Sequence, residues 1–403
     1  MKDLKHLIFF ENLLQEANND LVKQAKNEGK YAIGYTCYFM PEVLLDLPGC
    51  FSVRLRAPRC VSPDIATYYL SGRVCHYARS LMERALEGGF NFLDAQMATE
   101  TCTATCRFQE HLQQKHLDSV DDMRIIENDR FFCTFTDVPF KNNENGYAHY
   151  REQLRAHVLD PLRDNFGIDT SDEAIMKAIE EHNEVCRIIT EIGDFRKLDN
   201  PTITGYEFHV IQLVSLTCPK YLILPYLRET AEELKTREAD DMRRFRCKVV
   251  VAGSENDDPG FTQLIESCGA EVVCDRYCYG AVESRVPIVV KEGQDPLDAV
   301  SRHYLETSNC PRFMPQDVMR ARKQRLADLA KEYHADGIIV TSNKFCEYWS
   351  YERVIDTIIM PRDFGIPVCS IEKEYINNAS GQLRTRFQAF VESIEIKKIQ
   401  EGK

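Results

Sequence analysis

The chain has 403 residues, of which 44% are hydrophobic and 28% are charged, as in a soluble globular protein of two or three domains. Its formal net charge of −13 argues against nucleic acid and against anionic membranes as partners. The start of the chain, residues 1–6, is charged, and no apolar run is long enough to span a bilayer. We therefore expect a cytoplasmic protein.

The first 140 residues alternate between helical and strand patterns. In chain order, the apolar spacing predicts a helix at 3–28, a strand at 31–36, a short helix opened by Pro41, a strand at 51–55, a helix at 63–86, a strand at 90–97, a helix from Cys102 to Leu117 and a strand at 131–135. Such alternation is typical of an open α/β domain, which we expect to span residues 1–143.

The rest of the chain divides into a helical segment and a second α/β unit. Residues 144–240 are rich in Glu, Arg and Leu and are predicted to be helical. Within residues 241–403, strands are predicted at 247–254, 271–275, 336–341 and 366–371, and helices at 259–268, 296–306, 315–334 and 349–361. The continuous apolar run at 337–341 indicates a buried parallel strand. The predicted fold class is therefore α/β, with two open parallel-sheet domains and an additional helical segment.

The chain contains 16 cysteines, and a cytosol keeps thiols reduced, so this number indicates metal or redox chemistry before disulfides. Most free cysteines are small core residues, and we interpret Cys133, Cys186, Cys247, Cys268 and Cys369 in that way. Cys75, Cys102 and Cys346 instead lie just past predicted strands or on the helices beside them. Open parallel sheets bind ligands at the carboxyl ends of their strands. Three thiolates on a four-iron cluster would leave one iron open for a ligand or substrate.

Several short segments, in order along nearly the whole chain, resemble one family. They are residues 32–42 (AIGYTCYFMPE), 74–80 (VCHYARS), Thr101 and Cys102 with Glu110, 336–339 (DGII), 344–347 (KFCE), 365–367 (GIP) and 381–390 (GQLRTRFQAF). This ordered set is similar to the subunits of 2-hydroxyacyl-CoA dehydratases. The same family includes benzoyl-CoA reductase subunits and double-cubane cluster proteins.

The resemblance implies two flavodoxin-like domains plus helices, and a [4Fe–4S] cluster held by Cys75, Cys102 and Cys346. It also implies a lyase that acts on a CoA thioester through a ketyl radical. In this family a separate ATP-hydrolysing iron–sulfur activator protein supplies the low-potential electron. The chain has no phosphate-binding loop of its own, so any ATP would be hydrolysed by another polypeptide. A further expected partner is a second dehydratase subunit or a second copy of this chain.

The sequence departs from the family pattern at two places near the expected substrate site. Tyr38 stands where active dehydratase subunits tend to carry a small hydroxyl residue. After the second strand, where a glutamate would be a candidate base, the chain carries Arg54 and Arg56. These arginines are candidate contacts for CoA phosphates or for an acidic partner, or they cover an exposed rim. Loss of the base also suggests an accessory subunit that relays the electron.

Two polar residues near the start of the last helix, Gln382 and Arg384, are further candidate substrate contacts. They either orient a carboxylate or thioester, or cap and solvate that helix.

Additional cysteines leave two other functions open. Candidate extra cluster ligands are Cys37, Cys60, Cys278 and Cys310. With the first three they would suffice for an [8Fe–9S] double cubane in a reductase of small molecules, or for a subunit like those of benzoyl-CoA reductase. The third hypothesis is a cluster-free interaction protein that keeps the fold for partner binding. The iron content of the purified protein distinguishes the three.

Overall fold

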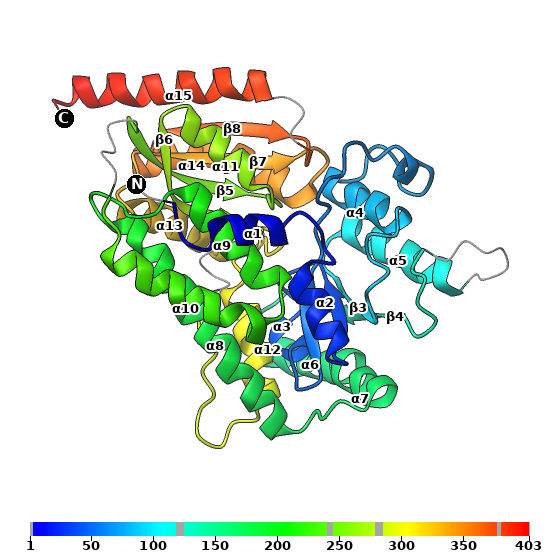
Figure 1. The fold of residues 1–403 in the computed structure, drawn as a ribbon. Helices are drawn as coiled ribbons and strands as arrows, with labels where there is room; N and C mark the ends of the chain where they lie inside the picture. Colours follow the sequence, from blue (N-terminus) through cyan, green and yellow to red (C-terminus); the bar gives the residue numbers. More distant parts are fainter. Residues whose placement is uncertain (1–2, 118–124, 240–244, 279–284, 377–379, 403) are drawn as a thin grey trace.

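The computed structural model describes residues 3–117, 125–239, 245–278, 285–376 and 380–402. It contains two four-stranded sheets, in which every pair of neighbouring strands is parallel. Figure 1 shows the sheets side by side, with helices around both. The prediction of two open parallel-sheet units with additional helices is therefore confirmed.

The first sheet consists of β1 (Tyr31–Tyr35), β2 (Cys50–Arg54), β3 (Ala95–Glu100) and β4 (Phe132–Asp137), in the order β2-β1-β3-β4. The helices of this part of the chain are α1 (Leu7–Leu13), α2 (Asp20–Asn27), α3 (Glu42–Leu45), the short 3₁₀ helix η1 (Ile65–Tyr68), α4 (His76–Leu86) and α5 (Thr103–Leu117). This strand order is that of a flavodoxin-like sheet, in which the chain reverses direction beside the first strand.

The second sheet repeats that order as β6-β5-β7-β8. Its strands are β5 (Cys247–Gly253), β6 (Ala270–Tyr277), β7 (Gly337–Asn343) and β8 (Val368–Lys373). The helices of this part are α11 (Pro259–Ser267), α12 (Pro296–Thr307), α13 (Gln316–Glu332), α14 (Glu347–Phe364) and α15 (Ser380–Gln400). One face of the sheet packs on α11 and α15, and the other packs on α13 and α14.

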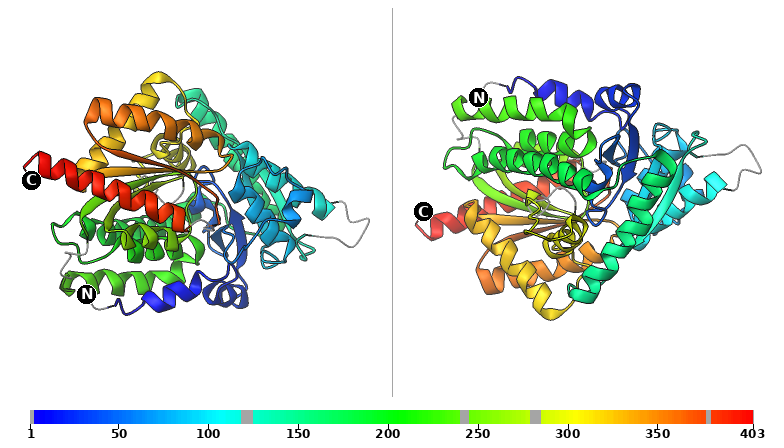
Figure 2. Two further views of the ribbon diagram at one scale, coloured as in Figure 1. Left: turned by 90° about the horizontal axis from the view of Figure 1, so that it is seen from above. Right: turned by 90° about the horizontal axis from the view of Figure 1, so that it is seen from below.

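Between the sheets in the sequence lie α6 (Glu144–Leu154), the π-helical turn η2 (Arg155–Leu159), α7 (Asp160–Phe166), α8 (Asp172–Asp194), the 3₁₀ turn η3 (Phe195–Lys197), α9 (Gly205–Thr217) and α10 (Lys220–Thr236). Both views of Figure 2 show α8, α9 and α10, in green, together along one side of the molecule. Helix α1 packs against α9 in this layer, and α12 packs against α6 and α8. The helical segment is thus as predicted, while the boundaries at 143 and 240 stay a prediction.

Several predicted elements differ in extent from the structure. The strand expected at 90–97, for example, is β3 at Ala95–Glu100. The single helix expected at 3–28 is divided into α1 and α2, because the Asn19 side chain accepts hydrogen bonds from the backbone N–H groups of Leu21 and Val22 and so starts a new helix. The helix expected at 63–86 becomes the short η1 and then α4. In the part of the chain that the structure describes, no helix is long and apolar enough to cross a membrane.

Candidate metal centre

The three cysteines expected to bind a cluster each stand directly before a helix. Cys75 is the N-cap of α4, and Cys346 is the N-cap of α14. Cys102 lies between Glu100, the last residue of β3, and Thr103, the first residue of α5. The positive ends of three helix dipoles therefore lie at these sulfur atoms, and they favour negatively charged thiolates there.

These three residues, which lie far apart in the sequence, come together in the structure. The thiols of Cys75 and Cys346 interact closely enough for each to shift the pKa of the other. Cys102 interacts electrostatically with both of them. Cys75 is buried, and Cys102 and Cys346 are partly buried against the same apolar cluster. The three sulfurs therefore share one sheltered region at the carboxyl ends of both sheets.

Hydrogen bonds between neighbouring residues hold the three cysteine-bearing segments together. The backbone N–H of His76 donates to the carbonyl of Lys344 at 3.4 Å. The hydroxyl of Tyr348 donates to the carbonyl of Thr101, also at 3.4 Å. Tyr375 adds a third link, because its backbone N–H donates to Nδ1 of His76 at 2.9 Å. The region is thus fixed by bonds between the two halves of the chain and not by the cysteines alone.

Mutual contact and burial set the pKa values of the three thiols. Interaction with the thiol of Cys346 lowers the pKa of Cys75 against the effect of burial, with help from the backbone N–H groups of Tyr77 and Ala78. The same interaction and burial raise the pKa of Cys346 well above its usual value, and burial raises the pKa of Cys102 to about 12. The protein therefore stabilises one thiolate of the three, and ionising all of them requires a bound cationic group.

The donor set fits an iron–sulfur cluster better than a single metal ion. Within the described ranges, no three His, Cys, Asp or Glu side chains lie close enough together to hold one ion. A cluster makes a different demand, because each thiolate binds its own iron and the ligands stand farther apart. Sulfur is also a soft ligand, which selects iron–sulfur clusters over hard cations such as Mg²⁺. The roles of the three cysteines remain predictions that this arrangement supports.

Three of the four extra cysteines lie beside this centre. Cys37 and Cys310 interact electrostatically with each other and with Cys278, and Cys278 also interacts with Cys346. The hydroxyl of Thr101 donates to the sulfur of Cys37 at 3.3 Å. Six thiols from both halves of the chain therefore gather in one region.

Cys60, the fourth extra cysteine, has different surroundings. Its thiol donates to the carbonyl of Ser62 at 3.8 Å, and burial raises its pKa to about 11. It lines a cavity of about 440 Å³ together with Arg56, Arg59 and Tyr375, among other residues. The sequence alone did not separate Cys60 from the other three candidates.

The two arginines expected to form a cationic surface lie inside the protein. Arg54 is 2% exposed and donates to a carboxylate oxygen of Glu255 at 2.9 Å. Arg56 is 7% exposed and donates to the carbonyls of Leu14 and Asp257 at 3.2 and 2.6 Å. Each guanidinium is held by internal acceptors, so these two side chains do not form an exposed patch. Their contact with a substrate stays a prediction.

The remaining candidate contacts are spread over two places. The hydroxyl groups of Tyr38 and Thr307 share a hydrogen bond of 2.7 Å. Tyr38 directly follows Cys37 in the sequence. Gln382 and Arg384 are exposed on α15, where Arg384 donates to the hydroxyl of Ser267 at 3.1 Å. Tyr38 is therefore the candidate contact nearest in sequence to one of the gathered thiols.

Sequence reasoning missed Glu255, a buried carboxylate near the cysteines. It is 4% exposed and follows β5, and it interacts electrostatically with Cys75 and Cys278. Burial raises the pKa of Glu255 to about 8 against the effect of Arg54, and Asp257 raises it further. The signal was present in the sequence as a run of acidic and amide residues, 255–258, directly after a buried strand.

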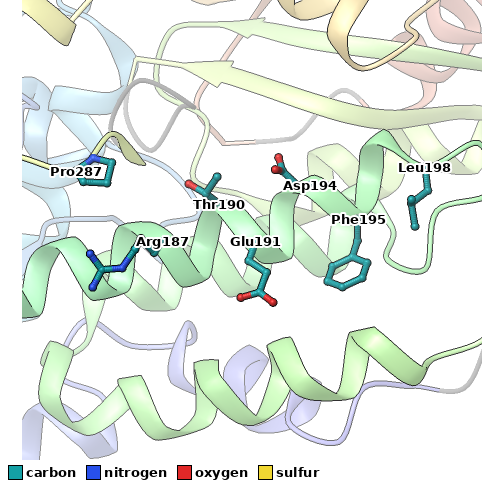
Figure 3. Close-up of a pocket in the computed structure, with 7 residues that line it drawn as sticks. All are labelled: Arg187, Thr190, Glu191, Asp194, Phe195, Leu198 and Pro287. Carbon is teal, nitrogen blue, oxygen red and sulfur yellow. The ribbon is translucent and has the colours of Figure 1, made fainter.

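A separate cavity of about 530 Å³ lies away from the cysteines (Figure 3). Its lining residues come from α8 and the turn after it, with Pro287: Arg187, Thr190, Glu191, Asp194, Phe195, Leu198 and Pro287. None of these is one of the candidate site residues. The cavity that contains Cys60 is closer to the centre, because its wall includes Tyr375, the residue bonded to His76.

Comparisons with known proteins find similar sequences over most of the chain. The model of the family described as "2-hydroxyglutaryl-CoA dehydratase, D-component" matches residues 37–394. The chain is 23% identical to the (R)-phenyllactyl-CoA dehydratase beta subunit of Clostridium sporogenes, over 96% of this chain and 97% of the relative. It is 22% identical to the putative dehydratase subunit YjiM of Escherichia coli strain K12, over 93% and 94%. It is 21% identical to the beta subunit of (R)-2-hydroxyglutaryl-CoA dehydratase of Acidaminococcus fermentans, over 93% and 95%.

Proposed function

The chain belongs to the 2-hydroxyglutaryl-CoA dehydratase D-component family, and from this we propose that it is the iron–sulfur subunit of a 2-hydroxyacyl-CoA dehydratase. Its curated relatives are named as dehydratases, enzymes of the lyase class. The observation that carries the proposal is the meeting of Cys75, Cys102 and Cys346 at the carboxyl ends of both sheets, where their thiols shift one another's pKa values. These three residues would hold a [4Fe–4S] cluster.

A cluster bound there supplies a single electron at low potential for the carbonyl of a CoA thioester, a task near the bottom of the iron–sulfur range. The absence of a phosphate-binding loop from the sequence supports a separate ATP-hydrolysing activator as the source of that electron. The names of two relatives as beta subunits support a second subunit in the assembly.

The residues around the cysteines provide shelter and fixed charge. Tyr348 and His76 join the three ligand segments, and this limits their movement and the entry of water. The buried pair of Arg54 and Glu255 lies beside them and places a guanidinium and a carboxyl group close to the thiols. Such fixed charges act strongly where water is excluded, and they tune the potential of a bound cluster.

One observation favours the alternative of a double-cubane reductase or a subunit like those of benzoyl-CoA reductase. Cys37, Cys278 and Cys310 gather beside the first three cysteines, and together they make six thiols. Six is about the number of thiolates that two bridged cubanes need. The single-cluster proposal is preferred because the first three thiols are the ones that stand at the starts of helices α4, α5 and α14.

The deciding experiment is a measurement of iron and sulfide per chain on anaerobically purified protein. About four irons would support the dehydratase proposal, and we expect Cys75→Ser, Cys102→Ser and Cys346→Ser each to lose most of them. Cys133→Ser, which changes a buried thiol in β4, is the matched control and should keep its iron.

Two other outcomes would overturn this proposal. About eight irons, lowered by Cys37→Ser or Cys310→Ser, would assign the double-cubane alternative. No iron or sulfide in folded, monodisperse protein would leave an interaction protein that keeps the fold without a cluster.

A further inference from the structure

The chain contains a single tryptophan, and the structure buries it in the first turn of α14. Trp349 is 3% exposed and stands three residues after Cys346, the N-cap of that helix. An indole has one hydrogen-bond donor, its N–H group, and no acceptor. Among the described residues, this N–H group finds no hydrogen-bond acceptor. The only polar group of Trp349 is therefore buried without compensation, although buried donors are nearly always satisfied.

The surroundings of the indole come from segments that carry two more of the gathered thiols. Arg276 lies in β6, two residues before Cys278, and its guanidinium carbon is 5.7 Å from the centre of the indole ring. The same guanidinium donates at 2.9 Å to the backbone carbonyl of Asn309, the residue before Cys310. The indole therefore packs where these two segments meet the start of α14.

A second set of contacts fixes the face of α14 on which Trp349 lies. Glu352 is three residues further along the helix, also on its buried face, and accepts from the guanidinium of Arg322 at 3.0 Å. Arg322 also donates to the carbonyls of Cys310 and Phe313, at 3.4 and 2.6 Å. The buried face of α14 is therefore held against the segment around Cys310.

Other buried polar groups near the thiols are better compensated than the indole. The Nε atom of Arg312, for example, has no acceptor among the described residues. The same guanidinium nevertheless donates to the carbonyls of Val138 and Pro139, at 2.6 and 3.2 Å. Trp349 has no second donor to use. Since a phenylalanine would fill this place without an unsatisfied donor, the indole N–H indicates an acceptor that belongs to a bound group.

We propose that the indole N–H of Trp349 donates a hydrogen bond to a sulfur atom of the iron–sulfur group held by the gathered cysteines, and so raises its reduction potential. This inference rests on the proposed function. A sulfur atom bound to iron carries negative charge and accepts hydrogen bonds, and such bonds tune the potential of the group. The bond is stronger in the reduced state, because the extra electron makes the sulfur atoms more negative. Trp349 would thus adjust the bound group without being one of its ligands.

The first test uses the fact that the chain has only one indole. In iron-loaded protein labelled with ¹⁵N at the indole nitrogen, the NMR spectrum contains one indole N–H resonance. We expect this resonance to shift and broaden on one-electron reduction, because its proton would be bonded to the group that takes up the electron. A resonance with the same position and width in both redox states would overturn the proposal.

The second test measures the reduction potential of the group by a redox titration followed by EPR. Trp349→Phe keeps an aromatic ring and removes the donor, so the potential should become more negative. At the wild-type midpoint, we expect the ratio of reduced to oxidised protein to fall about tenfold. Replacement of the single tryptophan by 5-fluorotryptophan keeps the ring and makes the N–H a stronger donor, so the potential should become less negative. Opposite shifts are expected from a hydrogen bond and not from altered packing alone.

Tyr333→Phe is the matched control and should leave the potential unchanged. Tyr333 is 2% exposed and ends α13 just before the amino end of β7, so it lies at the other end of the sheet from Cys346. If Trp349→Phe does not fold, the sign of the shift in the fluorotryptophan protein still decides between a hydrogen bond and none.

Iron content measured on every sample separates this inference from the proposed function. Iron-loaded protein whose potential is the same in Trp349→Phe, or shifts in the same direction with 5-fluorotryptophan, would overturn the inference alone. Folded wild-type protein without iron would overturn both.

Discussion

The two sheets have the same strand order but present different chemical groups at their carboxyl ends. The third strand of each sheet in chain order is followed by a predicted cluster ligand, Cys102 after β3 and Cys346 after β7. The first strand of each is followed by a thiol in one case, Cys37, and by a carboxylate in the other, Glu255. A shared topology therefore repeats the positions of a site, while the residue type at each position sets its chemistry.

The comparison extends to the segments between the second and third strands. Cys75 lies before α4 in the first half, and Cys310 lies before α13 in the second. With Cys278 directly after β6, each half contributes three of the six gathered thiols. Their surroundings differ, because Cys75 is buried and interacts with Cys346, whereas Cys278 is exposed.

The largest expected effect is a loss of iron in cysteine variants, and it tests whether the two halves of the chain bind one shared cluster. If they do, Cys102→Ser and Cys346→Ser lose iron to the same degree, because a cluster held by only two thiolates is not retained. Cys310→Ser, which changes the thiol in the segment before α13, should keep nearly all of its iron. The measurement is iron per chain with the visible spectrum. Equal loss of iron in Cys310→Ser would show that Cys310 is also a cluster ligand and would contradict the single-cluster assignment.

A smaller effect is expected from the ion pairs buried in the second half. Glu352→Gln removes a carboxylate that accepts from Arg322 and Lys323, all at most 3% exposed, and leaves two buried cations poorly compensated. Breaking a buried pair in this way costs about 3–5 kcal/mol, which urea unfolding would measure. The control Glu392→Gln on the exposed side of α15 should stay within about 0.5 kcal/mol. A loss below about 1 kcal/mol in Glu352→Gln would mean that water reaches this network.

The smallest effect concerns the dependence of stability on pH. Each half contains one buried carboxyl group with a shifted pKa, and the two pKa values are shifted in opposite directions. Burial would raise the pKa of Glu42 in α3, but Lys220, His182 and Tyr35 together lower it to about 2. Burial raises the pKa of Glu266 in α11 to about 7, against hydrogen bonds from backbone N–H groups. The ordinary pKa of both is 4.5, the value expected in the unfolded chain.

The signs follow from proton linkage. Stability from Glu42 is complete above pH 4.5 and is lost as the pH falls towards 2, so Glu42→Gln should flatten that acid limb. Glu266 binds its proton more tightly when folded, so stability falls as the pH rises from 4.5 to about 7, and Glu266→Gln should flatten that range. Over each of these two pH ranges, the free energy of unfolding changes by up to about 3 kcal/mol. Urea unfolding midpoints measured from low to neutral pH would show both changes. If the two variants had the same dependence of midpoint on pH, the opposite shifts of the two pKa values would be contradicted.

Part of the fold and of the candidate site follows from local sequence patterns. The strands at 31–35 and 337–343 are buried apolar runs, and such runs signal parallel strands wherever they occur. The helix boundary at Asn19 was missed because a single capping side chain, and not the apolar spacing, divides α1 from α2. The three short cysteine motifs were recognisable because each is defined by its immediate neighbours in the chain.

The sequence by itself therefore determined the two parallel sheets, the family and the motifs of the three cysteines that are predicted to bind a cluster. Tertiary structure alone decided that Cys278 and Cys310 join them, that Cys60 lies elsewhere and that Arg54 is buried against Glu255. It also decided that α14 turns its carboxylates inward. The physical reason is the separation in sequence between the residues involved. The periods of strands and helices are set by residues a few positions apart. The contacts named above join segments far apart in the chain, and they are selected by tertiary packing.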